Sequence, residues 1–193
     1  MTRNVAPSFL EEGAVAVSLS FDDGRPSQLD GAAILDEHGI KATFYVLPDQ
    51  VERAPERWAG LVGRGHELGN HSTAHPCSGN FEFASSNALE DWTLQAIAAD
   101  VDAATTSIEH LVGTRPLTFA YPCGQSFVGR GRQRQSYVPL IAERFVADVA
   151  TAARPETCPT GVTSPTSTPT RSMVATPTPC WVSSAKAARA ASG

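Results

Sequence analysis

The apolar pattern of the chain begins with a short run that predicts a strand. Residues 14–19 are apolar with β-branched members, which is typical of a buried strand, and Gly24 then lets the chain turn. Asp22 and Asp23 therefore lie where a strand passes into a loop, the place where α/β proteins build their sites. Taken alone, the two carboxylates fit a solvated Asp-Gly turn better than a functional site.

Helical and strand patterns then alternate along the chain. Residues 26–38 begin with a proline suited to a first helical turn, carry an apolar side and end at a glycine, so they predict a helix. Residues 40–47 predict a second strand, 55–62 a second helix and 66–70 a short third strand. A strand, a helix and a parallel strand make a βαβ unit, so the pattern predicts an α/β fold.

The second half of the chain continues this alternation before its composition changes. Residues 87–112 predict a long helix, 115–124 a strand and a turn, and 137–145 another helix. Residues 151–193 contain no Leu, Ile, Phe or Tyr, and Thr, Ala, Pro and Ser supply 29 of these 43 residues. Such a segment buries too little apolar area to offset its ordering entropy. We therefore expect a folded domain over residues 1–146 and a disordered or loosely attached low-complexity tail over 147–193.

Length and charge narrow the class of protein. The 193 residues favour one domain, and a net charge of −5 argues against a general nucleic-acid binder. Residues 1–13 show no signal-peptide pattern and no stretch is long enough for a membrane span, so the default expectation is the cytoplasm. The four cysteines lack Cys-x2-Cys spacing, and we expect mostly free thiols rather than a disulfide framework.

Three of the five histidines fall within residues 65–75. His71 and His75 are four residues apart, and on a helical turn both rings would approach one ion. Two imidazoles and one carboxylate make an open site for zinc or a similar divalent ion, with a position left for water. A pair of surface loop histidines is the simpler alternative, but the carboxylates upstream favour the metal site.

Two of these segments together resemble a known family. A strand followed by Ser-Phe-Asp-Asp-Gly at residues 20–24, and His-Ser-x-x-His about fifty residues later at 71–75, resemble the first two motifs of the polysaccharide deacetylases, carbohydrate esterase family 4. The resemblance covers roughly residues 14–146. It implies a catalytic domain over residues 1–146 that forms a distorted (β/α) barrel of about seven strands. About five strands are visible in this sequence, so we expect an incomplete barrel. The resemblance also implies removal of acetyl groups from N-acetylated or O-acetylated carbohydrate. It also implies the site residues: Asp22 as catalytic base, and Asp23, His71 and His75 as ligands of a divalent metal ion, which we expect to be zinc.

Residues 115–124 resemble the third family motif with departures. Where the family usually has Arg-Pro-Pro-Tyr-Gly, this chain has Ala-Tyr-Pro-Cys-Gly, so Ala120 replaces the arginine that orients the base in many members. The resemblance implies that the Cys123 backbone N–H donates to the oxyanion, a role that needs only a main-chain group. A nucleophilic Cys123 thiol is the alternative, which the lack of a following histidine disfavours.

The last family motifs, which include a general-acid histidine, are expected beyond residue 147, and no histidine follows His110. A shifted reading frame near residue 147 and a natural linker tail both account for this. A general acid typically raises the rate of such a reaction by ~10²–10⁴-fold. Because the expected histidine is absent, we predict metal binding with weak or absent turnover. Two alternatives are a non-catalytic carbohydrate-binding relic and a metal-dependent amidase that acts on small molecules.

Overall fold

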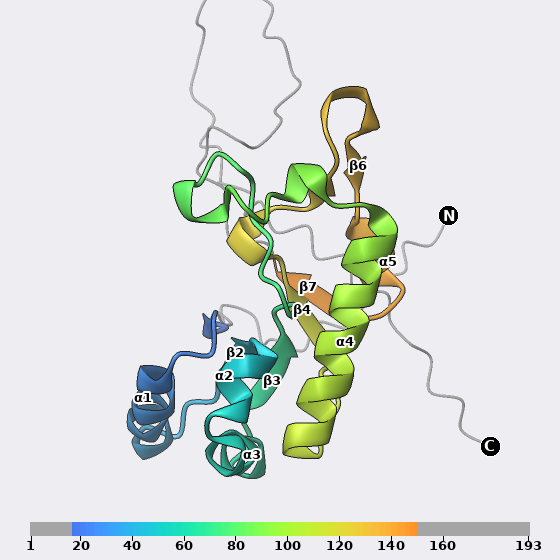
Figure 1. Ribbon diagram of the computed structural model, residues 1–193. Coiled ribbons are helices and arrows are strands. Elements are labelled where there is room, and N and C mark those ends of the chain that lie inside the picture. The colour runs from blue at the N-terminus through green and yellow to red at the C-terminus, as the bar shows by residue number, and fades with distance from the viewer. Residues whose placement is uncertain (1–16, 150–193) are drawn as a thin grey trace, which may run out of the picture.

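A five-stranded parallel sheet organises the protein (Figure 1). The computed structural model describes residues 17–149. The strands follow their sequence order across the sheet, as in a segment of a (β/α) barrel, and the sheet curls into a half-barrel. The five strands are β1 (Ser20–Phe21), β2 (Thr43–Val46), β3 (Glu67–Asn70), β4 (Thr118–Ala120) and β7 (Ala147–Val149).

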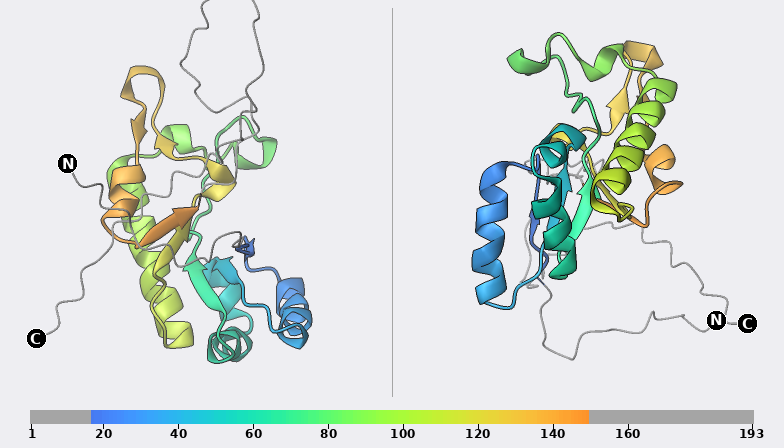
Figure 2. Two further views of the ribbon diagram at one scale, coloured as in Figure 1. Left: turned by 180° about the vertical axis from the view of Figure 1, so that it is seen from behind. Right: turned by 60° about the horizontal axis from the view of Figure 1, so that its bottom comes forward.

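The helices connect successive strands and lie on one face of the sheet. In the view from behind, the strands lie in front of the helices (Figure 2). The helices are α1 (Pro26–Glu37), α2 (Pro48–Glu52), α3 (Pro55–Gly63), α4 (Leu94–Val112) and α5 (Val138–Ala142). Short 3₁₀ turns are η1 (Glu82–Ala84), η2 (Leu89–Asp91), η3 (Pro122–Gly124) and η4 (Gly131–Gln133), and a small hairpin pairs β5 (Phe127–Val128) with β6 (Gln135–Ser136).

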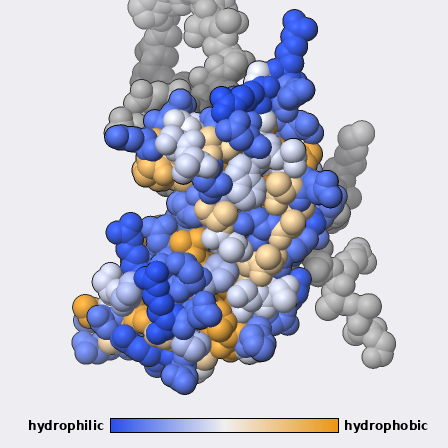
Figure 3. Space-filling view, viewed as in Figure 1, coloured by the Kyte–Doolittle hydropathy of each residue, from blue (hydrophilic) through white to orange (hydrophobic). Residues whose placement is uncertain are grey.

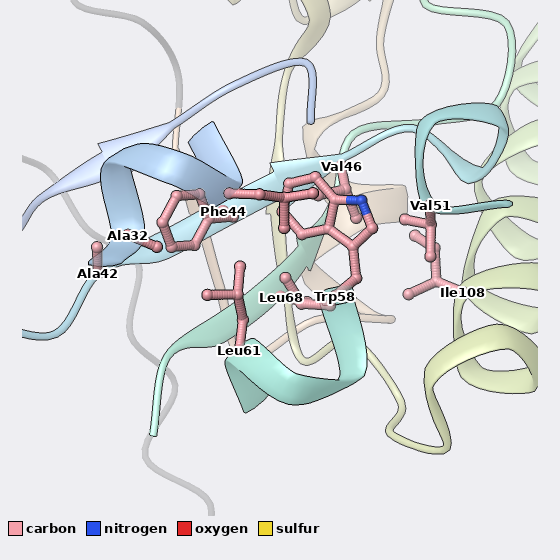
Figure 4. Packing of buried hydrophobic residues seen from close by; sticks show 10 residues of the cluster. Ala32, Ala42, Phe44, Val46, Val51, Trp58, Leu61, Leu68 and Ile108 are labelled. Carbon is pink, nitrogen blue, oxygen red and sulfur yellow. The ribbon is translucent and has the colours of Figure 1, made fainter. Parts of the chain in front are cut away.

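The core consists of two apolar clusters between the sheet and the helices. The first packs Phe44 and Val46 of β2 against Trp58 and Leu61 of α3 (Figure 4). The second gathers around Phe119 of β4, with residues of α5 and the hairpin. Helix α4 takes part in both, because its apolar positions recur at helical spacing along all of its length. The long helix therefore joins the two halves of the domain.

The exterior seen in Figure 3 is mostly hydrophilic, with smaller apolar areas between the charged side chains. Within residues 17–149, no helix is both long and apolar enough to cross a membrane.

The predicted elements occur in the predicted order, while several boundaries differ, and helix α2 and the β5–β6 hairpin were not predicted. The first strand was expected at 14–19; residues 14–16 lie outside the described part, and the sheet pairing instead involves the Leu19 carbonyl, Ser20 and Phe21. The long helix begins at Leu94 rather than near residue 87. The Thr93 side chain caps it by accepting a hydrogen bond from the backbone N–H of Ala96.

Three residues that the sequence assigned to the tail belong to the sheet. Ala147–Val149 form strand β7, which pairs in parallel with β4, and the Val149 carbonyl accepts a hydrogen bond from the Tyr121 N–H. A segment of three residues is too short for a local pattern to identify it as a strand. Its pairing with a buried neighbouring strand makes it part of the sheet. The remainder of the predicted tail, residues 150–193, lies outside the described part of the chain.

The Tyr45 ring packs directly against the backbone of Gly69 on the neighbouring strand. A Cβ at Gly69 would overlap the Tyr45 ring and would lie 2.9 Å from Thr118 Oγ1. We therefore expect Gly69→Ala to lower the free energy of unfolding by about 1–3 kcal/mol in urea denaturation, because a packed interior tolerates no added methyl here. Gly31→Ala, in helix α1 with no atom within 4 Å, is the matched control and should stabilise by about 0.5–1 kcal/mol. Equal midpoints for the two variants would contradict this expectation.

Candidate active site

Polar side chains gather at the carboxyl ends of β1 and β3. Asp22 and Asp23 follow β1, and His71 follows β3, while both strands flank β2 in register. Because parallel strands end at the same edge of the sheet, residues almost fifty positions apart in sequence meet there. The loop after β3 then brings His75 to the same place.

Asp23, His71 and His75 present three ligand-type atoms to one another. Asp23 Oδ1 lies 3.6 Å from His71 Nε2 and 3.4 Å from His75 Nε2, and all three atoms lie within 4.8 Å of one another. Ligands placed about 2.0–2.2 Å from a tetrahedral zinc ion lie about 3.3–3.6 Å apart. The donor set and its spacing therefore fit a divalent cation.

The spacing of the two histidines predicted a helical turn, but the structure does not place them on one. They belong to an irregular loop in which Ser72 (φ 67°) and His75 (φ 46°) adopt the left-handed conformation, and Asp23 (φ 78°) does so as well. Such a conformation is costly for residues other than glycine and persists only where surrounding contacts hold it. Here the Ser72 hydroxyl accepts a hydrogen bond from the His75 N–H. The rings converge through this loop geometry instead of helical periodicity.

The orientation of His71 is set from the next strand. Its ring is almost fully buried, and Nδ1 lies 2.9 Å from the Ala120 carbonyl oxygen. Since a carbonyl only accepts, Nδ1 donates to it, and Nε2 is the nitrogen that faces Asp23. Ala120, which stands where the third motif usually has arginine, thus acts here through its main chain.

The two adjacent carboxylates have opposite pKa shifts. The His71 ring, helped by His75 and Arg25, lowers the pKa of Asp23 to about 2. Arg25 reaches the outer oxygen, Oδ2, at 3.2 Å, so Oδ1 remains turned to the imidazoles. Burial raises the pKa of Asp22 above its ordinary value, and the neighbouring Asp23 carboxylate acts in the same direction. Two carboxyl groups with pKa values shifted in opposite directions suit different tasks. The group with the low pKa suits an anionic ligand, and the group with the raised pKa suits a proton acceptor.

The surroundings of His75 favour its neutral form, which is the form that metal ligation requires. Burial lowers its pKa, and the nearby His71 ring adds to this effect.

The comparison of this chain with known families accords with that geometry. The family model for polysaccharide deacetylase matches residues 11–134. The chain belongs to the polysaccharide deacetylase family. A chitooligosaccharide deacetylase of Sinorhizobium fredii is 39% identical over 69 residues, which is 33% of this chain and 31% of that protein. A peptidoglycan-N-acetylglucosamine deacetylase of Bacillus cereus is 38% identical over 65 residues, 31% of this chain and 22% of that protein.

Among solved structures, the peptidoglycan deacetylase PdaC from Bacillus subtilis aligns with a TM-score of 0.49 and 26% identity, covering 64% of this chain and 55% of that one. The matches to the two curated deacetylases span less than a third of their lengths.

The deacetylase motifs are supported by buried residues that sequence reasoning missed. Asn70, fully buried, donates to the Val101 carbonyl and the Thr105 hydroxyl of α4, while its Oδ1 accepts from the Ser72 N–H at 2.7 Å. The Asp100 carboxylate accepts from the backbone N–H groups of Thr73 and Ala74. The one available signal was an amide at the end of an apolar strand, next to His71. Helix α4 therefore anchors the loop that carries both histidines.

We expect Asn70→Ala to destabilise the domain by about 1–3 kcal/mol, because it leaves buried hydrogen-bonding groups of α4 and of Ser72 unpaired. Asn80→Ala, at an exposed position of the same loop, is the control and should stay within about 0.5 kcal/mol of the parent. Chemical denaturation of the three proteins measures the difference. An Asn70 variant as stable as the parent would show that the loop is held by other contacts.

The expectation of free cysteines is wrong for one pair. Cys77 and Cys123 form a disulfide across 46 residues, with Cα atoms 5.7 Å apart. Their separation in sequence gave no indication of this pairing, because only the tertiary fold brings the loop after β3 to the turn η3. The other two cysteines, Cys158 and Cys180, lie outside the described residues.

The turn η3 presents a main-chain donor beside this disulfide. Cys123 adopts φ 54°, and within the described residues its N–H has no backbone acceptor. The Cys77–Cys123 bond ties the turn to the loop of His75, whose Nδ1 lies 3.6 Å from Cys77 Sγ. A sulfur in a disulfide is no nucleophile, so the alternative of a reactive Cys123 thiol does not apply to this form of the chain.

Proposed function

We propose that the chain is a metal-dependent hydrolase that removes acetyl groups from N-acetylated or O-acetylated carbohydrate, acting in the first case on a carbon–nitrogen bond other than a peptide bond. The observation that carries the proposal is the convergence of Asp23, His71 and His75 within 4.8 Å of one another. Membership of the polysaccharide deacetylase family supports the same reaction class.

Asp23 Oδ1, His71 Nε2 and His75 Nε2 would hold the cation. A set of two imidazoles and one carboxylate with an open position suits zinc best among common divalent ions. When bound, the cation supplies a Lewis acid that polarises the acetyl carbonyl and lowers the pKa of water. The low pKa of Asp23 keeps this carboxylate anionic over the working range of such an enzyme.

Asp22 would accept the proton of the attacking water on its carboxylate. Its raised pKa makes it a stronger base than an ordinary carboxylate. No described residue donates a hydrogen bond to its side chain, so both oxygens stay available. The Cys123 N–H would donate to the oxyanion of the tetrahedral intermediate, a role that needs no particular side chain.

The protonation of the leaving amine has no evident donor among the described residues. Of the other described histidines, His66 is buried and hydrogen-bonded to Asp36. His38 and His110 are exposed at the C-terminal ends of α1 and α4, so none of the three belongs to the site. Together with Ala120 in place of the usual arginine, this favours slow turnover. The missing proton donor also supports a second candidate function, a carbohydrate-binding relic that retains the metal ligands but does not hydrolyse its ligand.

Metal analysis and acetate release on one purified sample test the proposal. The names of two relatives suggest a chitooligosaccharide and a peptidoglycan N-acetylglucosamine fragment as first substrates. We expect about one zinc ion per chain and slow acetate release that stops with a chelator and returns with added zinc. Zinc binding without any acetate would favour the relic. Release that is indifferent to the chelator would refute the metal-dependent mechanism.

A further inference from the structure

The disulfide lies against one of the proposed metal ligands. Cys77 follows His75 by two residues and is fully buried, and Cys123 joins it from the turn η3. His75 Nδ1 lies 3.6 Å from Cys77 Sγ. The nitrogen and the two sulfurs of His75, Cys77 and Cys123 all lie within 4.8 Å of one another.

His75 therefore faces two different donor groups with its two ring nitrogens. Nε2 lies 3.4 Å from Asp23 Oδ1, whereas Nδ1 faces the sulfur pair. The first group is a carboxylate and imidazole set. The second, were its sulfurs free, would be a set of two thiolates and one imidazole, which favours zinc and other thiophilic ions more strongly.

We propose that reduction of the Cys77–Cys123 disulfide creates a second cation site, formed by Cys77 Sγ, Cys123 Sγ and His75 Nδ1, that binds a thiophilic divalent ion. Two cysteines and one histidine, with a fourth position for water, are an established zinc ligand set. The proposal concerns the sulfur pair and does not depend on acetyl hydrolysis.

The step that opens the site is thiol–disulfide exchange with a dithiol reductant. One thiolate of the reductant attacks a sulfur of the pair, and its second thiol then resolves the mixed disulfide. The reductant becomes a cyclic disulfide, and two electrons and two protons pass to Cys77 and Cys123. Each thiol releases its proton to solvent when the cation binds.

The shared imidazole links the two sites. A cation on His75 Nδ1 withdraws electron density from the ring, and it holds the ring against the sulfurs rather than against Asp23. The reduced chain should therefore hold a cation at Asp23 and His71 less tightly than the oxidised chain does. Disulfides persist in oxidising compartments and are rare in reducing ones, so the two states correspond to two environments.

Cobalt(II) titration of the full-length chain tests the second site. Cys158→Ser and Cys180→Ser leave the pair as the only source of thiolate, and Asp23→Ala removes a ligand of the first site. The dithiol is removed by gel filtration under inert gas before cobalt is added. We expect a near-ultraviolet sulfur-to-cobalt charge-transfer band, saturating at one ion per chain, in the reduced protein and none in the oxidised protein.

Two further variants separate ligation from folding. Cys77→Ser should abolish the band. His75→Ala keeps both thiols and should weaken cobalt binding by about tenfold or more, since even outer partners of metal ligands contribute 10- to 100-fold. Circular dichroism confirms that each reduced variant is folded. A reduced folded protein without the band, or a band that persists in Cys77→Ser, would overturn the proposal. Acetate release by the oxidised parent tests the proposed function separately.

Discussion

We expect Asp22→Asn to lower acetate release by ~10²–10⁴-fold while the chain keeps its divalent cation. The amide has the size of the carboxylate but cannot take a proton from water. Asp22 contributes none of the three atoms that converge at the proposed metal site. The measurement is kcat/KM on a chitooligosaccharide, paired with the zinc content of the same sample.

The pH profile gives this prediction a second readout. Burial raises the pKa of Asp22, and a general base works only when deprotonated. Activity should therefore be present above the raised pKa and lost as the pH falls through it, with an acid limb above the range of an ordinary carboxyl group. Asp49→Asn, an exposed carboxylate on α2, is the control and should change neither rate nor profile. An Asp22 variant that keeps its activity would exclude Asp22 as the base.

We expect Asp23→Ala to lose both the cation and the activity, with zinc affinity falling by more than about 100-fold. Asp23 supplies the only carboxylate oxygen among the three converging atoms, and it lies between the two imidazoles. Removing it leaves two neutral nitrogens, which hold a divalent ion far more weakly. Calorimetric zinc titration of the metal-free protein measures the loss.

The neighbouring Asp22→Asn variant is the matched control for this second prediction. Both changes remove one negative charge from the same turn, so a difference in zinc affinity between them reports ligation rather than net charge. If Asp23→Ala retains zinc at the parental affinity, the proposed ligand set is incorrect. If both variants lose zinc to the same extent, the loss reports the missing negative charge and gives no support to Asp23 as a ligand.

The sequence by itself determined the order of the elements and the chemical types at the site. An apolar run followed by Asp22 and Asp23 predicts carboxylates at a strand end, because burial patterns and turn residues are local properties. The same local signals located strand β3 and placed His71 and His75 directly after it. Family motifs are likewise local strings of residues, which is why the resemblance could be recognised without coordinates.

Only the tertiary structure decided how these groups meet. The Cys77–Cys123 bond spans 46 residues, His71 takes its orientation from the carbonyl of Ala120, and Ala147–Val149 become a strand only by pairing with β4. Each of these features depends on contacts between segments far apart in the chain. No local propensity encodes such contacts. A contact made by a backbone carbonyl is especially hard to predict, because every residue type carries the same carbonyl group.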